Sequence, residues 1–357
     1  MTLQAQPPAV AADSPADACR FVGLHRFDDF KTESESATER TLVSPVLRAP
    51  IAWNELVVSW NAATRSNSWL KLEARGVYPE RQTKYYSLAL WSADAPDHPR
   101  QSFARQRDDD GEVKTDIWLM KRPGADVQLR ITLGCTNGSA ALELKFVGLS
   151  FLNTQLQPDS PKSDHRAWGR IIATPERSQS AYPQQEGWCS PTSLSMVLSR
   201  WADVLHRPEL NLDVPEVAAG IYDPRFGGTG NWPFNTAFAG GFPGMRAYVA
   251  RLSDLTEVED WIEAGIPVVL SARWDLLSPG RKPTGSGHLV VCIGFTENGG
   301  VVINDPATNL KKGQNVRHIY ERENVIKAWK QSRNTAYLIY PETAKIPADP
   351  LGHWDKP

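Results

Sequence analysis

Cys189 has the surroundings in this sequence that best suit nucleophilic chemistry. It lies in the segment Gly187-Trp-Cys189-Ser-Pro-Thr-Ser193, and the apolar residues at 194, 197, 198 and 201 then follow a helical period. A cysteine at a helix N-terminus lies near unpaired backbone N–H groups and the positive end of the helix dipole, and both stabilise a thiolate. The same N–H groups can bind an oxyanion formed from an attacked carbonyl. The alternative interpretation is a capping cysteine with no catalytic role.

A thiol nucleophile needs a base, and His288 is the best placed of the seven histidines. It follows a Gly-Ser-Gly turn and opens an apolar strand, and Asp305 ends the next predicted strand. Residues 297–300 have the composition of a hairpin turn, which would bring His288 and Asp305 to adjacent strand ends. A carboxylate there can hold the imidazole in one tautomer. The alternative is that both residues only end strands at a polar surface.

Three glutamines before Cys189 are candidates for a side-chain oxyanion donor. Gln179, Gln184 and Gln185 all lie in the segment that leads to the nucleophile. A glutamine N–H can stabilise a developing oxyanion. Glutamines in such segments are usually solvated, so residue type alone does not choose among the three.

The first part of the chain that must position these side chains is rich in strand patterns. Residues 40–152 hold period-two segments separated by turn-rich stretches, which predicts an all-β, jelly-roll-like sandwich. Val113–Leu119, for example, is predicted as one strand. Residues 153–168 are polar with two prolines and are predicted as a linker. We predict a flexible N-terminal tail at residues 1–39 and a C-terminal tail at residues 343–357.

The pattern of the second part, residues 169–342, predicts helices in its first half and mainly strands after them, which is an α+β layout. One helix begins at Cys189, and another is expected from about residue 254 to 264, with Ser253 as N-cap and Gly265 as its C-terminal stop. The glycine-rich segment 227–241 is expected to be a loop beside the cleft.

Several sequence blocks in this second part resemble those of the bacterial cysteine peptidases related to the double-glycine leader peptidases. The resemblance covers about residues 168–342, with Cys, His and Asp in the family's order. The blocks are Ser178-Gln179 with Glu186–Leu198, Gly230–Thr236, Gly265–Val269, Gly287–Val291 and Ile303–Ala307. Residues 1–150 lie outside it.

The resemblance implies a papain-like fold and a peptide substrate, with no metal or cofactor. It implies Cys189 as nucleophile, His288 as general base and acid, and Asp305 as the residue that orients His288. Gln179 matches the family's oxyanion-hole glutamine, with Gln184 or Gln185 as the fallback.

Composition excludes several other classes of protein. The 357 residues carry a net charge of −2, and the pI of about 6.4 excludes a strongly basic nucleic-acid binder. No apolar run reaches the roughly 18 residues of a membrane-spanning helix. No leader pattern is visible, although relatives of this two-part type look extracytoplasmic, so localisation is weakly assigned outside the cytoplasm. The four cysteines allow a Cys19–Cys135 bridge, or two unpaired thiols.

Two alternatives to a hydrolytic peptidase remain open. The same cysteine could pass its acyl group to an amine or thiol, as a transpeptidase or acyltransferase does. The first region could instead bind carbohydrate or a cell surface beside an inactive peptidase-like domain. Exposed tryptophans would support that binding role, and five lie there: Trp53, Trp60, Trp69, Trp91 and Trp118. Of these, Trp60 alternates with the core face and is expected to be buried.

Overall fold

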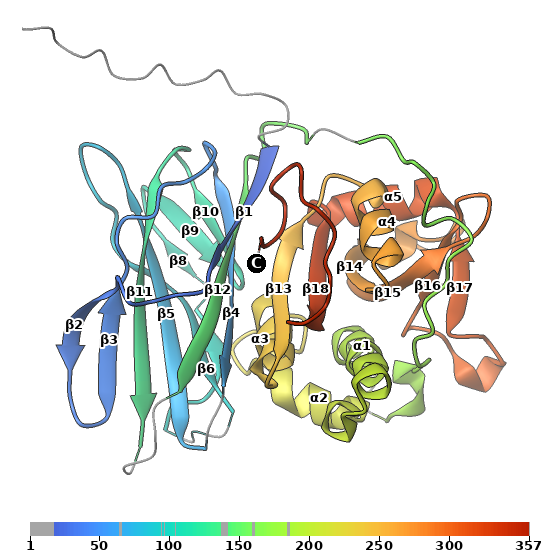
Figure 1. The fold of residues 1–357 in the computed structure, drawn as a ribbon, viewed down its shortest axis with the longest axis horizontal. Coiled ribbons are helices and arrows are strands. Elements are labelled where there is room, and N and C mark those ends of the chain that lie inside the picture. The colour runs from blue at the N-terminus through green and yellow to red at the C-terminus, as the bar shows by residue number, and fades with distance from the viewer. Residues whose placement is uncertain are drawn as a thin grey trace, which may run out of the picture.

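The computed structural model describes residues 18–63, 66–93, 95, 97–103, 105–136, 142–158, 161–183 and 186–356. Figure 1 shows two regions side by side, an N-terminal region of strands and a C-terminal region of helices around a sheet. Strands β4 and β12 of the first region lie beside β13 of the second.

Two antiparallel sheets make up the described part of the N-terminal region. The first runs in the order β1 (Cys19–Leu24), β12 (Glu143–Leu152), β4 (Glu55–Ala63), β10 (Ile117–Met120), β9 (Gly111–Lys114), β8 (Gln106–Arg107). The second runs β2 (Lys31–Glu35), β3 (Glu39–Val43), β11 (Asp126–Cys135), β5 (Ser68–Val77), β6 (Tyr86–Ser92), β7 (Gln101–Ser102). Apolar side chains from both sheets share one core. The expectation of a largely antiparallel β region is confirmed.

Strand β4 is buried on both faces, although its alternating sequence predicted one exposed face. Leu56, Val58 and Trp60 point into the core of the N-terminal region. The alternate residues face β13 (Met245–Arg251) of the C-terminal region: Asn61 exchanges hydrogen bonds with the backbone of Ala247, at 2.6 and 3.1 Å. The polar face of β4 is therefore an interface between the two regions. On this face the side chains of Ser59 and Asn61 each have a hydrogen-bond partner in the backbone of β13.

The same face of β4 carries a buried ion pair. The carboxylate of Glu55 pairs with Arg251, and the side chains are only 5% and 2% exposed. The second oxygen of Glu55 accepts from Arg333 at 3.0 Å, but the Arg333 side chain is half exposed. The carboxylate of Glu55 thus neutralises the charge of the Arg251 guanidinium, which has almost no access to water.

We expect Glu55→Gln to destabilise the protein strongly, because it leaves the buried Arg251 guanidinium without its counter-charge. Breaking a buried ion pair by removing one partner typically costs about 3–5 kcal/mol. The control is Arg333→Gln, which removes a half-exposed partner and should cost no more than about 1 kcal/mol. Urea unfolding of the two variants measures the difference. Equal midpoints for the two variants would contradict this account of the interface.

The C-terminal region is built on one antiparallel sheet flanked by helices. Its strand order is β13, β18 (Thr335–Pro341), β14 (Val268–Arg273), β15 (Gly287–Phe295), β16 (Val301–Asn304), β17 (Arg317–Tyr320). The α-helices are α1 (Cys189–Leu205), α2 (Val214–Ile221), α3 (Trp232–Gly241), α4 (Leu255–Glu263) and α5 (Arg322–Trp329). Short 3-10 turns lie at η2 (Gln179–Ala181), η3 (Pro208–Leu210), η4 (Trp274–Leu276), η5 (Leu310–Lys312) and η6 (Lys330–Ser332).

Helix α4 lies close to its predicted position, but its N-cap is one residue later than predicted. Asp254, not Ser253, is the N-cap, and its carboxylate accepts from the backbone N–H of Thr256. Ser253 instead donates from its hydroxyl and its backbone N–H to Glu257. Gly265 has a φ of +81° and ends the helix, as predicted, because a glycine adopts the left-handed conformation without strain.

The expectation of a loop over residues 227–241 is wrong, because helix α3 occupies most of that segment. Asn231 is its N-cap and accepts from the N–H of Phe234, and a proline fits the first turn. Its glycines allow close packing: a Cβ on Gly240 would lie 2.0 Å from the Asn61 side chain of β4. The glycine-rich composition therefore reflects contact between the two regions.

The predicted tails are wrong for the residues that the structure describes. Strand β1 pairs with β12 along its length, and β2 follows, so ordered structure begins well before residue 39. At the other end His353, Trp354 and Asp355 are buried, and Figure 1 places the C-terminus between the two regions. The N–H of Asp355 donates to the hydroxyl of Tyr248 on β13. Both segments had polar compositions that concealed these contacts.

The remaining general expectations concern the linker, the cysteines and membrane-spanning helices. The described part of residues 153–168 lies along the C-terminal region, where the Trp168 indole donates to Glu259 at 2.9 Å.

Cys19 and Cys135 are both free thiols, so the bridge that the sequence allowed is absent. In the part of the chain that is described, no helix is long and apolar enough to cross a membrane.

Candidate active site

Cys189 is the first residue of α1, so the predicted placement at a helix N-terminus holds. The turn is closed by Thr192, whose N–H and hydroxyl both donate to the carbonyl of Trp188, at 3.1 and 2.7 Å. The helix that follows is almost wholly buried, whereas Cys189 itself is half-buried. A fixed helix thus presents a partly accessible thiol at its positive end.

Helix α1 is fastened to β15, the strand that carries His288. The hydroxyl of Ser193 donates to the carbonyl of Leu289 at 2.9 Å, one residue beyond His288. Burial alone would raise the pKa of the Cys189 thiol. Its hydrogen bond to His288, the charge of that imidazole, and the N–H groups of Leu289 and Ser190 outweigh burial and lower the pKa below its ordinary value.

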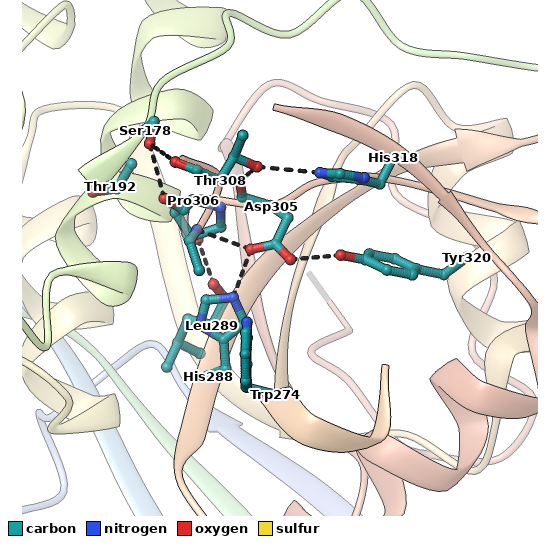
Figure 2. A network of polar contacts seen from close by, with 12 residues as sticks. Ser178, Thr192, Trp274, His288, Leu289, Asp305, Pro306, Thr308, His318 and Tyr320 are labelled. Carbon is teal, nitrogen blue, oxygen red and sulfur yellow. Dashed lines mark hydrogen bonds and ion pairs between the residues drawn. The ribbon is translucent and has the colours of Figure 1, made fainter. Parts of the chain in front are cut away.

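The predicted hairpin brings His288 and Asp305 together. Strands β15 and β16 are antiparallel, and Asp305 directly follows β16. The Nε2 atom of His288 lies 2.7 Å from an oxygen of Asp305, and Figure 2 shows the two side chains facing each other. Because Nε2 is engaged by Asp305, Nδ1 is the ring nitrogen left for the Cys189 thiol.

His288 is only 4% exposed, and its surroundings favour the charged imidazolium. Burial alone would lower the pKa of His288. The charge and hydrogen bond of Asp305 and the contact with Cys189 outweigh burial and raise this pKa to about 10. Asp305 is stabilised in turn. Burial opposes its ionisation, yet His288, Tyr320 and the N–H of Ala307 hold its pKa well below the usual range. The three groups therefore favour a thiolate, an imidazolium and a carboxylate.

Tyr320, which the sequence analysis did not single out, is a further partner of Asp305. Its hydroxyl donates to the second carboxylate oxygen at 2.6 Å, as Figure 2 shows. The hydroxyl also accepts from Arg281 at 3.1 Å, and Arg281 lies over the ring of Trp274. Tyr320 comes from β17, a four-residue strand with polar neighbours. The sequence signal that could have found it is the period-two segment Arg317-His-Ile-Tyr320.

Gln179 begins the short turn η2, which is tied to the loop after Asp305. Its N–H donates to the carbonyl of Pro306, and Ser178 donates to the carbonyl of Thr308. The side-chain Oε1 of Gln179 is buried without a hydrogen-bond partner among the described residues. Gln184 and Gln185, the fallback candidates, lie outside the described residues.

Asp116 of the N-terminal region is linked through α3 to the residue beside Cys189. Ser190, next to Cys189, donates to Asn235 of α3 at 2.8 Å. The first N–H of that helix, from Trp232, donates to Asp116 in the β9–β10 turn at 2.9 Å. Burial raises the pKa of Asp116 to about 6 despite this hydrogen bond. A carboxylate from the first region therefore caps a helix that contacts the residue beside the thiol.

Cys292, clusters of possible metal ligands and the tryptophans of the first region were the other groups that could carry a function. Cys292 is fully buried, and burial raises its pKa to about 12, as expected of an inert thiol. In the described parts of the chain, no group of three or more His, Cys, Asp or Glu side chains is arranged to hold a metal ion. The five tryptophans considered for carbohydrate binding are all buried: Trp53, Trp60, Trp69, Trp91 and Trp118. None of them offers an exposed ring face.

Comparisons with known proteins agree with the resemblance of the second part, and they add a match for the first part, which the resemblance did not cover. Residues 171–337 match the Peptidase_C39 like family, and residues 3–150 match the Peptidase C39 N-terminal domain. Residues 171–337 are therefore similar to the C39-like peptidase family, which suggests a peptidase. No curated protein matches the chain. A Bacillus anthracis protein described as a C39-like peptidase is similar in structure, at 20% identity and a TM-score of 0.38, over 49% of this chain and 99% of its own.

Proposed function

We propose that this protein is a cysteine peptidase in which Cys189, His288 and Asp305 act as a catalytic triad. The observation that carries the proposal is the alignment of three groups. A helix-terminal thiol with a lowered pKa contacts His288, and His288 lies 2.7 Å from Asp305. These are the nucleophile, the base and the orienting group that amide hydrolysis through a covalent intermediate requires.

In the proposed reaction, the Cys189 thiolate attacks the carbonyl carbon of a peptide bond. The oxyanion that forms is stabilised by the N–H groups at the start of α1 and by the side-chain amide of Gln179. The His288 imidazolium gives its proton to the leaving amine as the C–N bond breaks, which leaves a thioester on Cys189. His288 then takes a proton from water as water attacks the thioester, and the thiolate is restored.

We further propose that the C-terminal region has a papain-like arrangement and the N-terminal region a jelly-roll-like sandwich. The papain-like arrangement is supported by a nucleophile at the start of α1, fastened to the sheet whose strand β15 carries the histidine. The sandwich is supported by two antiparallel sheets that share one core. The domain boundaries after residues 152 and 168 stay part of this proposal.

The test is a peptide library prepared by trypsin digestion of a bacterial proteome, incubated with the full chain and analysed by mass spectrometry. New peptide termini are expected, and they should be absent with the Cys189→Ser variant. Adding glycinamide distinguishes hydrolysis from acyl transfer, because transfer would append glycinamide to the new C-termini. Identical peptide patterns for the two proteins would overturn the proposal.

We expect Tyr320→Phe to lower activity without abolishing it. The variant removes one hydrogen bond to Asp305, and a net contribution of about 1 kcal/mol corresponds to a loss in kcat/KM of less than about tenfold. Without that donor the pKa of Asp305 rises, because its carboxylate becomes a stronger acceptor, and its interaction with the imidazolium strengthens. The pKa of His288 should rise with it, so the alkaline limb of the pH profile should move to higher pH. An unchanged profile with lowered activity would indicate a purely structural role.

A further inference from the structure

The carboxylate of Asp223 is completely buried and accepts four hydrogen bonds from described residues. Its Oδ1 atom accepts from the backbone N–H groups of Ser102, Arg225 and Phe226, at 3.2, 3.0 and 3.2 Å. Its Oδ2 atom accepts from the side-chain amide of Asn231 at 3.0 Å. Three of these donors follow Asp223 in the chain, whereas Ser102 belongs to β7 of the N-terminal region. One buried carboxylate therefore closes a loop on itself and fastens that loop to the first region.

Residues 223–231, hereafter the Asp223 loop, contact the turn that comes just before Cys189. The hydroxyl of Thr229 donates to the carbonyl of Gly187 at 2.9 Å. Gly187 has a φ of +74°, which a glycine adopts without strain, so the chain turns sharply at this point. The Asp223 loop therefore holds the turn that leads into the nucleophile.

The same loop reaches the other side of the nucleophile through helix α3. Asn231 is the N-cap of α3, and its side-chain amide joins that helix to Asp223. One turn on, Asn235 donates to the carbonyl of Asn231 and accepts from the hydroxyl of Ser190, each at 2.8 Å. Ser190 directly follows Cys189, and its N–H is among the groups that stabilise the thiolate. Hydrogen bonds that start at Asp223 thus reach residues on both sides of the nucleophile.

The N-terminal region holds both ends of the Asp223 loop. Before the loop, the Arg100 guanidinium donates to three carbonyls at the end of α2, those of Ala219, Gly220 and Tyr222. A cation is favourable at that end of a helix. At the far end of the loop, Asp116 accepts from the first N–H of α3. The position of the loop therefore depends on side chains of the first region.

We propose that Asp223 is a positioning residue of the peptidase site, which holds the Asp223 loop so that the turn around Cys189 keeps the thiol against His288. The inference rests on the function proposed above and adds a residue that touches neither the substrate nor the reacting atoms.

Catalysis through a thiolate is sensitive to such support, because a small displacement of a catalytic group lowers the rate strongly. A loosened Asp223 loop would release the carbonyl of Gly187 and the side chain of Ser190. The thiol of Cys189 would then spend less time in contact with His288, and its thiolate would be less stabilised. A carboxylate that only stabilised the fold would change the unfolding midpoint without changing the reactivity of the folded protein.

The test exchanges the two side chains that meet at Oδ2 of Asp223. Asp223→Asn keeps an oxygen that can accept from the three backbone N–H groups, but it turns an amide towards the amide of Asn231, so two donors face each other. Combining Asp223→Asn with Asn231→Asp restores one donor and one acceptor, and the carboxylate introduced at position 231 can still cap α3.

Two single variants complete the set. Thr229→Val removes only the hydroxyl that donates to Gly187. Asp349→Asn is the matched control, because Asp349 also organises its own loop in the C-terminal segment. It accepts from three backbone N–H groups, those of Gly352, His353 and Trp354.

Two rates are measured on the full chain and referred to the folded fraction, which urea unfolding gives. One is the alkylation of Cys189 by iodoacetamide at about pH 6, where an ordinary thiol is almost entirely protonated. The other is kcat/KM for a peptide that the parent protein cleaves. Asp223→Asn should slow both rates by about tenfold, because a lost hydrogen bond leaves buried donors unpaired. The exchange should return both to within about threefold of the parent.

Thr229→Val should slow alkylation about fivefold, and Asp349→Asn should leave both rates within about twofold of the parent. Losses that the exchange does not reverse, or equal losses in Asp349→Asn, would overturn the proposal. If Asp223→Asn does not fold, Thr229→Val decides, and unchanged alkylation in that variant would overturn it. A parent protein that cleaves no peptide contradicts the proposed function instead, while alkylation of Cys189 still tests the role of Asp223.

Discussion

Replacing Cys189 with serine is expected to lower kcat/KM by about 10⁴-fold or more, because no other group can form the covalent intermediate. Removing one member of a catalytic triad typically leaves only the contribution of the oxyanion hole and of substrate binding. The substitution changes one atom at a half-buried site, so the urea midpoint should stay within error of the parent protein. Cleavage of the peptides found in the library experiment measures the effect.

The control for this variant is Cys292→Ser, which changes the fully buried cysteine of β15. It tests the same chemical change on the strand that carries His288, without touching the thiol that contacts His288. It is expected to affect stability more than peptide cleavage by the folded fraction. Retained cleavage by Cys189→Ser, with loss in Cys292→Ser, would contradict the assignment of the nucleophile.

His288→Gln is expected to lower kcat by about 10³-fold, within the 10²–10⁴-fold range of general acid–base catalysis. A glutamine can still hydrogen-bond to Asp305, but it can neither accept nor give the proton that the leaving amine needs. The loss should appear in kcat more than in KM, because the interaction acts on the transition state. Initial rates over a range of peptide concentrations separate the two parameters.

His318→Gln is the matched control, since it replaces a second histidine of the same polar network. His318 lies 3.2 Å from the hydroxyl of Thr308, and Figure 2 shows it on the far side of Asp305 from His288. It does not contact the thiol in the proposed mechanism, so kcat should change by less than about tenfold. Equal losses in the two variants would argue against a special role for His288.

The sequence predicted the central part of the site because that part depends on local structure. Cys189 at a helix start and His288 at a strand start could be inferred from periodicity and turns. The contact between His288 and Asp305 followed from one short hairpin, whose register is set over fewer than twenty residues. In such a hairpin, the residues that end adjacent strands must lie close together.

The features that sequence analysis missed depend on contacts between distant segments. Tyr320 reaches Asp305 from a short strand, and helix α3 has a composition typical of a loop until β4 is placed against it. The predicted strand Val113–Leu119 is instead a hairpin, β9 and β10, which turns at Thr115 with a φ of +56°. A threonine rarely adopts that conformation, so its sequence gave no sign of a turn.

The N-terminal region is packed against the C-terminal region through buried side chains of both. Asn61 and Ser59 of β4 hydrogen-bond to the backbone of β13. Asp116 caps α3, which contacts Ser190 beside Cys189. The C-terminal segment fills part of the same interface through Trp354, which packs on Trp261. Both regions therefore complete each other's buried surface, and the first contributes to the setting of Cys189.

The central claim is that Cys189 is a thiolate paired with the His288 imidazolium. Its most direct test is the rate of alkylation of Cys189 by iodoacetamide between pH 4 and pH 10 in the parent protein and in His288→Gln. An ordinary thiol reacts in proportion to its thiolate, which forms around a pKa of about 8.5. Because the pKa of Cys189 is lowered, the parent protein should react rapidly below that pH. In His288→Gln, burial remains without the imidazolium, so the reaction should move to higher pH. A parent protein that follows an ordinary thiol, unchanged by the substitution, would contradict the account.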